Sequence, residues 1–149
     1  FDGRPGDPTL PDRAREALLD WVALNPDAVL CVRPRAGDAP PPLPASPQVR
    51  LTGQDWPLAP LLHAVDAVVT LTSTVGLEGH LAGARLVQVS GSVFDEAMPL
   101  GRFGIADETV PVEGVVAAVD RCTRLGRRET AAAEGGATRR VLGVVAEFL

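Results

Sequence analysis

The fold is decided by one stretch of sequence, Val65-Asp66-Ala67-Val68-Val69-Thr70-Leu71-Thr72-Ser73-Thr74-Val75-Gly76-Leu77-Glu78. Its first half is a short apolar run rich in β-branched residues, which is typical of a strand covered on both faces. Its second half begins with hydroxyl-bearing residues and contains a glycine, a pattern typical of a helix start. The stretch therefore predicts a buried strand that runs directly into a helix.

Outward from this stretch, the sequence alternates between the same two kinds of element. Helical spacing of apolar residues predicts helices over residues 10–24, 58–65, 74–82, 111–125 and 138–149. Short apolar runs predict strands over residues 28–32, 49–52, 67–72 and 85–89. Residues 34–47 are a proline-rich loop, and residues 93–109 are predicted to be irregular.

Apolar strands that alternate with helices predict one α/β domain, a parallel sheet lying between helices. In such sheets ligands bind at the carboxyl ends of the strands. We therefore expect the loops after Val32, Thr72 and Val89 to share one edge.

Charge and composition exclude several classes of partner. The 149-residue chain has a net charge of -5, so it lacks the basic surface with which proteins neutralise nucleic-acid polymers. Neither a signal-peptide pattern nor an apolar run of about 18 residues is present, which predicts no membrane span and no export address. Because the first residue is Phe1, we expect the chain to be part of a longer protein.

The cysteines and histidines of the chain are expected to have structural roles. Cys31 and Cys122 have no metal-ligand spacing, and we expect both to be buried thiols. His63 is expected at the surface or half-buried, and His80 in a structural role. The absence of HExxH, DxD, P-loop and GxGxxG patterns leaves a metal site without support.

Arginine pairs and one carboxylate pair are further candidates for polar sites. Arg33 and Arg35 follow a predicted strand and are candidates for a phosphate contact, with a solvated loop as the alternative. Two later pairs are expected on solvated helix faces: Arg127 with Arg128, and Arg139 with Arg140. The carboxylates of Asp95 and Glu96 are candidates for general acid or base work, although a solvated turn is the favoured interpretation.

The strand-to-helix junction is the main candidate site. Ser73 and Thr74 offer hydroxyl donors, and the unpaired N–H groups and dipole of a helix start attract phosphate. Gly76 would allow a close backbone approach, and Glu78, one turn on, would accept hydrogen bonds from sugar hydroxyls. The alternative is a plain helix cap, with Ser73 or Thr74 as the N-cap and Glu78 supporting the dipole.

Residues 61–96, LLHAVDAVVTLTSTVGLEGHLAGARLVQVSGSVFDE, resemble the pattern of capsule-polysaccharide-type glycosyltransferases of the GT-B architecture. The matched positions are Asp66, Thr70, Ser73, Thr74, Gly76, Glu78 and Gly83. The resemblance extends over residues 28–119. It implies a Rossmann-like three-layer α/β/α sandwich with a mostly parallel sheet, the donor-binding carboxyl-terminal domain of that architecture, formed here by residues 1–149.

In related enzymes the matching Ser and Thr hold the phosphates of a nucleotide-sugar donor, and the matching Glu contacts donor hydroxyls. The resemblance thus implies donor-binding roles for Ser73, Thr74, Gly76 and Glu78. The family's basic-Pro-His-Pro signature corresponds to Arg33-Pro34-Arg35-Ala36, so Arg35 stands where a phosphate-binding His is usual. A guanidinium neutralises phosphate but does not titrate near neutral pH, so Arg35 suits phosphate binding and cannot act as a titrating acid.

The function that follows is metal-independent sugar transfer from a nucleotide-sugar donor in bacterial cell-surface or capsule polysaccharide synthesis. The nucleotide-sugar is a substrate, and no cofactor is implied. The acceptor-binding amino-terminal domain would be missing, so this chain alone would bind but hardly turn over. The expected location is the cytoplasm, with peripheral association at the inner face of the membrane through the full-length protein.

Two alternatives to the transferase remain open. One is a UDP-sugar 2-epimerase-like domain, which uses a similar Ser-to-Glu segment. The other is a non-catalytic Rossmann-like scaffold or interaction domain, which the altered signature and the proline-rich loop favour.

Overall fold

The computed structural model describes residues 6–53 and 55–129. Its elements are α1 (Leu10–Leu24), β1 (Leu30–Val32), β2 (Val49–Leu51), α2 (Leu58–Ala64), β3 (Ala67–Thr70), α3 (Thr74–Leu81), β4 (Arg85–Val89), β5 (Glu108–Val110), the 3-10 turn η1 (Val112–Gly114) and α4 (Val115–Leu125). The predicted helices and strands that fall within these residues are confirmed, with small differences at their ends. The predicted helix over 138–149 lies outside the described residues, as do Arg139 and Arg140.

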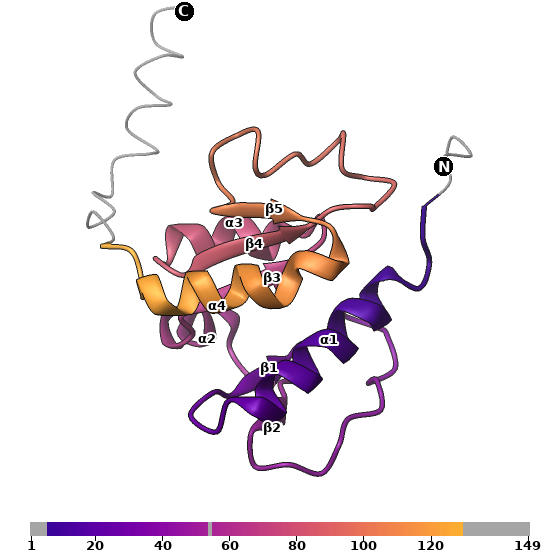
Figure 1. Ribbon diagram of the computed structural model, residues 1–149, viewed down its shortest axis with the longest axis vertical. Coiled ribbons are helices and arrows are strands. Elements are labelled where there is room, and N and C mark those ends of the chain that lie inside the picture. The colour runs from indigo at the N-terminus through magenta and orange to yellow at the C-terminus, as the bar shows by residue number, and fades with distance from the viewer. Residues whose placement is uncertain (1–5, 54, 130–149) are drawn as a thin grey trace, which may run out of the picture.

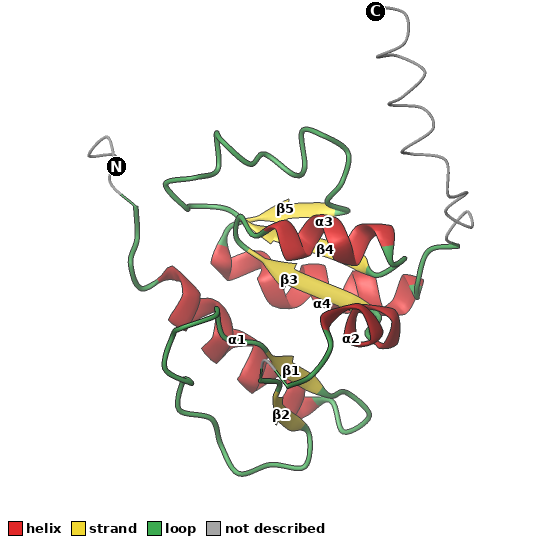
Figure 2. Ribbon diagram, turned by 180° about the vertical axis from the view of Figure 1, so that it is seen from behind, coloured by secondary structure: helices red, strands yellow, loops and turns green. Residues whose placement is uncertain are grey.

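All strand pairing in the described residues is parallel, so the predicted α/β class is correct. The strands form two ladders, one of β1 with β2 and one in the order β3–β4–β5 (Figures 1 and 2). The single sheet that we expected is therefore divided, and the loop after Val32 leaves a different ladder from the loops after β3 and β4. β1 and β2 have three residues each, and Pro34, close after β1, has no backbone N–H. β1 therefore offers few backbone N–H and C=O groups for pairing with a further strand.

β5 was not predicted, because residues 93–109 were expected to be irregular throughout. Its sequence, Glu108-Thr109-Val110, lacks the continuous apolar run by which the other strands were recognised. β5 is at the edge of its ladder, and Thr109 is exposed. A strand buried on only one face does not need the apolar run of a fully covered strand.

One face of the three-stranded ladder packs against α1 and α4. Val87 and Val89 of β4 are fully buried there. α1 contributes apolar residues at four-residue spacing, and α4 contributes a matching stripe: Leu10, Ala14 and Leu18 from α1, and Val115, Ala118, Val119 and Cys122 from α4. Burial of these side chains supplies the main hydrophobic stabilisation of the domain.

The opposite face of the ladder is covered by α3, as Figure 2 shows. Two glycines on one side of α3 bring the helix close to the strands. A Cβ added at Gly76 would lie 2.9 Å from Cγ2 of Thr70, and one at Gly79 would lie 2.8 Å from Cγ2 of Val68. The helix therefore packs at a distance that a larger residue at either position would disturb.

Both cysteines are free thiols, as predicted. Cys122 is buried in the core between α1 and α4, whereas Cys31 is only half-buried in β1. Within residues 6–53 and 55–129, the longest helices are too short and too polar to cross a membrane.

Candidate functional site

The predicted junction begins where β3 ends. Ser73 is the N-cap of α3, and its Oγ accepts a hydrogen bond of 3.2 Å from the N–H of Val75. The N–H of Ser73 in turn donates to Oγ1 of Thr70 at 3.3 Å. Ser73 and Thr74 are both exposed. The predicted cap is thus present, and both hydroxyls lie at the surface of the first helical turn.

The other two residues of the motif lie on opposite sides of α3. Gly76 is buried and faces the sheet, where Thr70, Leu86 and Leu100 fill the space around its Cα. Its missing side chain therefore serves the packing of α3. Glu78 is exposed, and its side chain makes no hydrogen bond or ion pair with any described residue.

Arg33 and Arg35 make their polar contacts with other segments than this junction. Arg33 is half-buried, and its Nη1 donates to the backbone carbonyls of Gly53 at 3.1 Å and Trp56 at 3.0 Å. It fastens the loop that follows β2. Arg35 is exposed, in a turn that its carbonyl closes by accepting from the N–H of Asp38. Among the described residues, no hydrogen bond joins either arginine to Ser73 or Thr74.

Asp95 differs from the expected solvated turn. It is half-buried, and its Oδ2 accepts from the N–H of Gly91 at 2.6 Å. Its Oδ1 is shielded from solvent and has no hydrogen-bond partner among the described residues. The neighbouring Glu96 is exposed.

The two histidines have different surroundings. His63 is exposed in the last turn of α2, as expected. His80 is half-buried and holds a neighbouring loop, because its Nδ1 lies 2.7 Å from the carbonyl oxygen of Ile105. The predicted structural role of His80 is confirmed.

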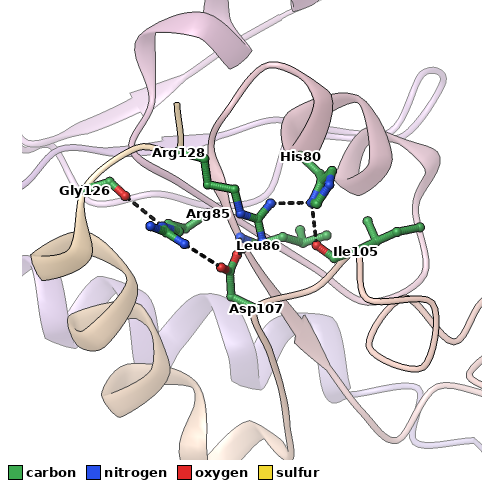
Figure 3. A network of polar contacts seen from close by, with 7 residues as sticks. All are labelled: His80, Arg85, Leu86, Ile105, Asp107, Gly126 and Arg128. Carbon is green, nitrogen blue, oxygen red and sulfur yellow. Dashed lines mark hydrogen bonds and ion pairs between the residues drawn. The ribbon is translucent and has the colours of Figure 1, made fainter. Parts of the chain in front are cut away.

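A polar network that we did not predict surrounds Asp107 at the start of β5 (Figure 3). Its carboxylate accepts from the Leu86 N–H at 2.7 Å and pairs with Arg85 at 3.0 Å and Arg128 at 2.7 Å. Arg128 also contacts Nδ1 of His80. Burial is the largest influence on the pKa of Asp107 and raises it, but the Leu86 N–H and the two guanidinium groups together hold the pKa below its ordinary value.

The expectation that Arg127 and Arg128 are solvated is therefore wrong. Arg127 is also half-buried and donates to the carbonyls of Leu62, Val65 and Ala82. The sequence gives no sign of these contacts, because the partners of Arg127 are backbone oxygens. Only the position of the pair, directly after the Gly126 that ends α4, hints at a capping role.

A second unpredicted feature is a cavity of about 480 Å³ beneath the loop that joins β4 to β5. Its lining includes Gln88, Asp95, Gly101, Arg102, Asp107 and Thr109. Gln88 is 2% exposed and fastens this loop, since its Nε2 donates to the Met98 carbonyl at 2.9 Å and its Oε1 accepts from the Gly101 N–H at 3.2 Å.

Comparison with protein-family models, with curated proteins and with solved structures finds no match to this chain. In the part of the chain that the structure describes, no three His, Cys, Asp or Glu residues gather as a metal site. The candidate function therefore rests on the residues and their geometry.

Proposed function

We propose that this chain is the donor-binding half of a bacterial glycosyltransferase that uses a nucleotide-sugar in cell-surface or capsule polysaccharide synthesis. One observation carries the proposal: the hydroxyls of Ser73 and Thr74 are exposed at the first turn of α3, directly after the parallel strand β3. In α/β domains, ligands bind beyond the carboxyl ends of parallel strands. The resemblance of residues 61–96 to capsule-type transferases supports the same position.

In this proposal the two ladders belong to one Rossmann-like three-layer domain of the GT-B type. The first turn of α3 presents N–H groups and the positive end of the helix dipole to the donor phosphates. The Thr74 hydroxyl donates to the same phosphate oxygens, and Glu78, exposed one turn on, accepts from donor hydroxyls. Arg35 is exposed on its own loop and adds a cation for the diphosphate when the donor is bound.

The chemistry is electrostatic. Sugar transfer leaves negative charge on the departing nucleotide, and fixed donors at the helix start stabilise that charge without a metal ion. The acceptor and the base that deprotonates it would come from an amino-terminal partner domain. This chain alone therefore binds the donor and scarcely turns it over, and the full-length protein works in the cytoplasm or at the inner face of the membrane.

A non-catalytic interaction domain is the second candidate, and one observation favours it. Arg33, which the resemblance places at the phosphate signature, donates hydrogen bonds to the carbonyls of Gly53 and Trp56. An arginine held by two backbone oxygens stabilises a loop without any ligand.

A titration of the 149-residue chain with UDP, CDP, UMP and CMP separates the two candidates. We expect backbone amide shifts at residues 73–78, and we expect Ser73→Ala combined with Thr74→Ala to weaken binding about tenfold or more. Ser46→Ala is the matched control, because Ser46 Oγ also accepts from the N–H two residues on, Gln48, at 3.2 Å. The interaction domain is favoured if none of the four nucleotides shifts these amides.

A further inference from the structure

The cavity beneath the β4–β5 loop is lined by residues of β4, of β5 and of the loop between them. Gln88 of β4 is paired in register with Thr109 of β5, and both line the cavity. α3 packs on β3 and β4, whereas the loop from Ser90 to Ala106 passes over β5 (Figures 1 and 2). The cavity is therefore flanked by the loop and the edge strand, and its lining includes neither Ser73 nor Thr74.

The loop is held in place above the sheet at several points, so the cavity is a preformed feature. Gln88 bonds both Met98 and Gly101, and a Cβ added at Gly101 would lie 2.2 Å from Oγ1 of Thr109. The volume of about 480 Å³ falls within the range of small-molecule sites.

Asp95 supplies the first recognition group. Its Oδ2 is already bonded to the Gly91 N–H, but its Oδ1 is shielded from solvent without a partner among the described residues. Buried polar atoms in folded proteins almost always have a hydrogen-bond partner, and leaving one without a partner costs free energy. Asp95 lines the cavity, and a turn of its carboxylate would bring Oδ1 to a ligand hydroxyl that supplies the missing donor.

Arg102 supplies the second recognition group. It lines the cavity, is exposed, and makes no hydrogen bond or ion pair with any described residue. Asp107, the other lining carboxylate, is already paired with both Arg85 and Arg128, so two cations there outweigh one anion. With Arg102 and Asp95 counted as well, three guanidinium groups at or beside the cavity face two carboxylates, a balance that favours a ligand with an anionic group.

We propose that this cavity binds a small hydroxylated anion of the sugar-phosphate class, with its phosphate at Arg102 and a hydroxyl donating to the carboxylate of Asp95. Thr109 also lines the cavity, and its hydroxyl is a further hydrogen-bonding group for the ligand. This site is additional to the proposed donor site and does not depend on it.

The test uses glucose 1-phosphate as the probe, with glucose and inorganic phosphate as separate ligands. We expect glucose 1-phosphate to shift the amides of Gly101 and Thr109 at concentrations up to about 10 mM, and to bind more tightly than either separate ligand. Arg102→Gln and Asp95→Asn should each weaken binding about tenfold, and Thr109→Val should weaken it in a protein whose loop anchors are intact. Arg50→Gln, at an exposed position of β2, is the matched control and should bind as the wild type does.

Several results would overturn the proposal. They are the absence of shifts at Gly101 and Thr109, shifts confined to residues 73–78, or unchanged affinity in both Arg102→Gln and Asp95→Asn. The Ser73→Ala and Thr74→Ala double variant distinguishes the two sites, because it should lose nucleotide binding and keep binding of glucose 1-phosphate at the cavity. Thermal melts of each variant show whether a loss of binding reflects a loss of folding.

Discussion

Gly76 lies where α3 packs closely against β3 and β4. A Cβ at this position would meet methyl groups of Thr70, Leu100 and Leu86 at 2.9, 3.2 and 3.3 Å. Alanine normally favours a helix over glycine by about 1 kcal/mol, but overpacking a filled core costs about 1–3 kcal/mol. We predict that Gly76→Ala lowers the free energy of unfolding by about 1 kcal/mol in urea denaturation. Glu78→Ala on the exposed side of α3 should stay within about 0.5 kcal/mol, and a stabilised Gly76→Ala protein would contradict this account.

Asp107 makes stability depend on pH in the acid range. Its pKa is lower in the folded protein than its ordinary value, so its contribution is complete above about pH 4 and is lost as the pH falls through the folded pKa. We predict that Asp107→Asn is less stable than the wild type at neutral pH and that the gap narrows toward about pH 2. Urea unfolding across this range measures the gap. The control is Glu113→Gln, because the Glu113 side chain is 69% exposed; this variant should keep the steeper pH dependence of the wild type. Parallel curves of unfolding free energy against pH for all three proteins would disprove the role of Asp107.

The buried side chain of Gln88 on β4 is one of the anchors of the loop between β4 and β5. Gln88 satisfies the carbonyl of Met98 and the N–H of Gly101, and a leucine of similar size would leave both without that partner. We predict that Gln88→Leu lowers the free energy of unfolding by about 1–3 kcal/mol and speeds hydrogen exchange at the Gly101 amide. Amides within the β3–β4 ladder are the internal control. Unchanged exchange at Gly101 would mean that other contacts hold the loop.

At the scale of elements, the sequence predicts whatever is buried on a regular period. α1 buries Leu10, Ala14, Leu18 and Val22 at four-residue spacing, and this spacing identifies the helix and its bounds. β5 is not predicted from the sequence, because an edge strand with an exposed threonine has no such pattern of buried residues. The role of Gln88 is also not predicted from the sequence. A buried polar residue within a strand is explained only by the loop that folds above it.

At the scale of the whole molecule, the α/β class follows from periodicity, but the assembly of the elements does not. The division into two ladders depends on contacts between segments far apart in the chain, and no local pattern encodes them. The sequence predicted that the hydroxyls of Ser73 and Thr74, together with Glu78, lie at the start of a helix as candidate site residues. It did not predict the Asp107 network. The three charged residues of that network, Arg85, Asp107 and Arg128, look like ordinary surface charges when read in sequence.

Arg127 ties distant parts of the molecule together. After α4 ends at Gly126, its guanidinium donates to the carbonyls of Leu62 and Val65 at the end of α2 and of Ala82 at the end of α3. The last carbonyls of a helix lack partners within the helix, and a cation there also complements the helix dipole. A lysine ammonium keeps the charge but lacks the planar fork that bonds several oxygens at once. We therefore predict that Arg127→Lys lowers the free energy of unfolding by about 1–3 kcal/mol in urea denaturation. Arg124→Lys, at a side chain that is 77% exposed, should change it by less than about 0.5 kcal/mol, so equal losses in the two variants would show that Arg127 does not join the helices.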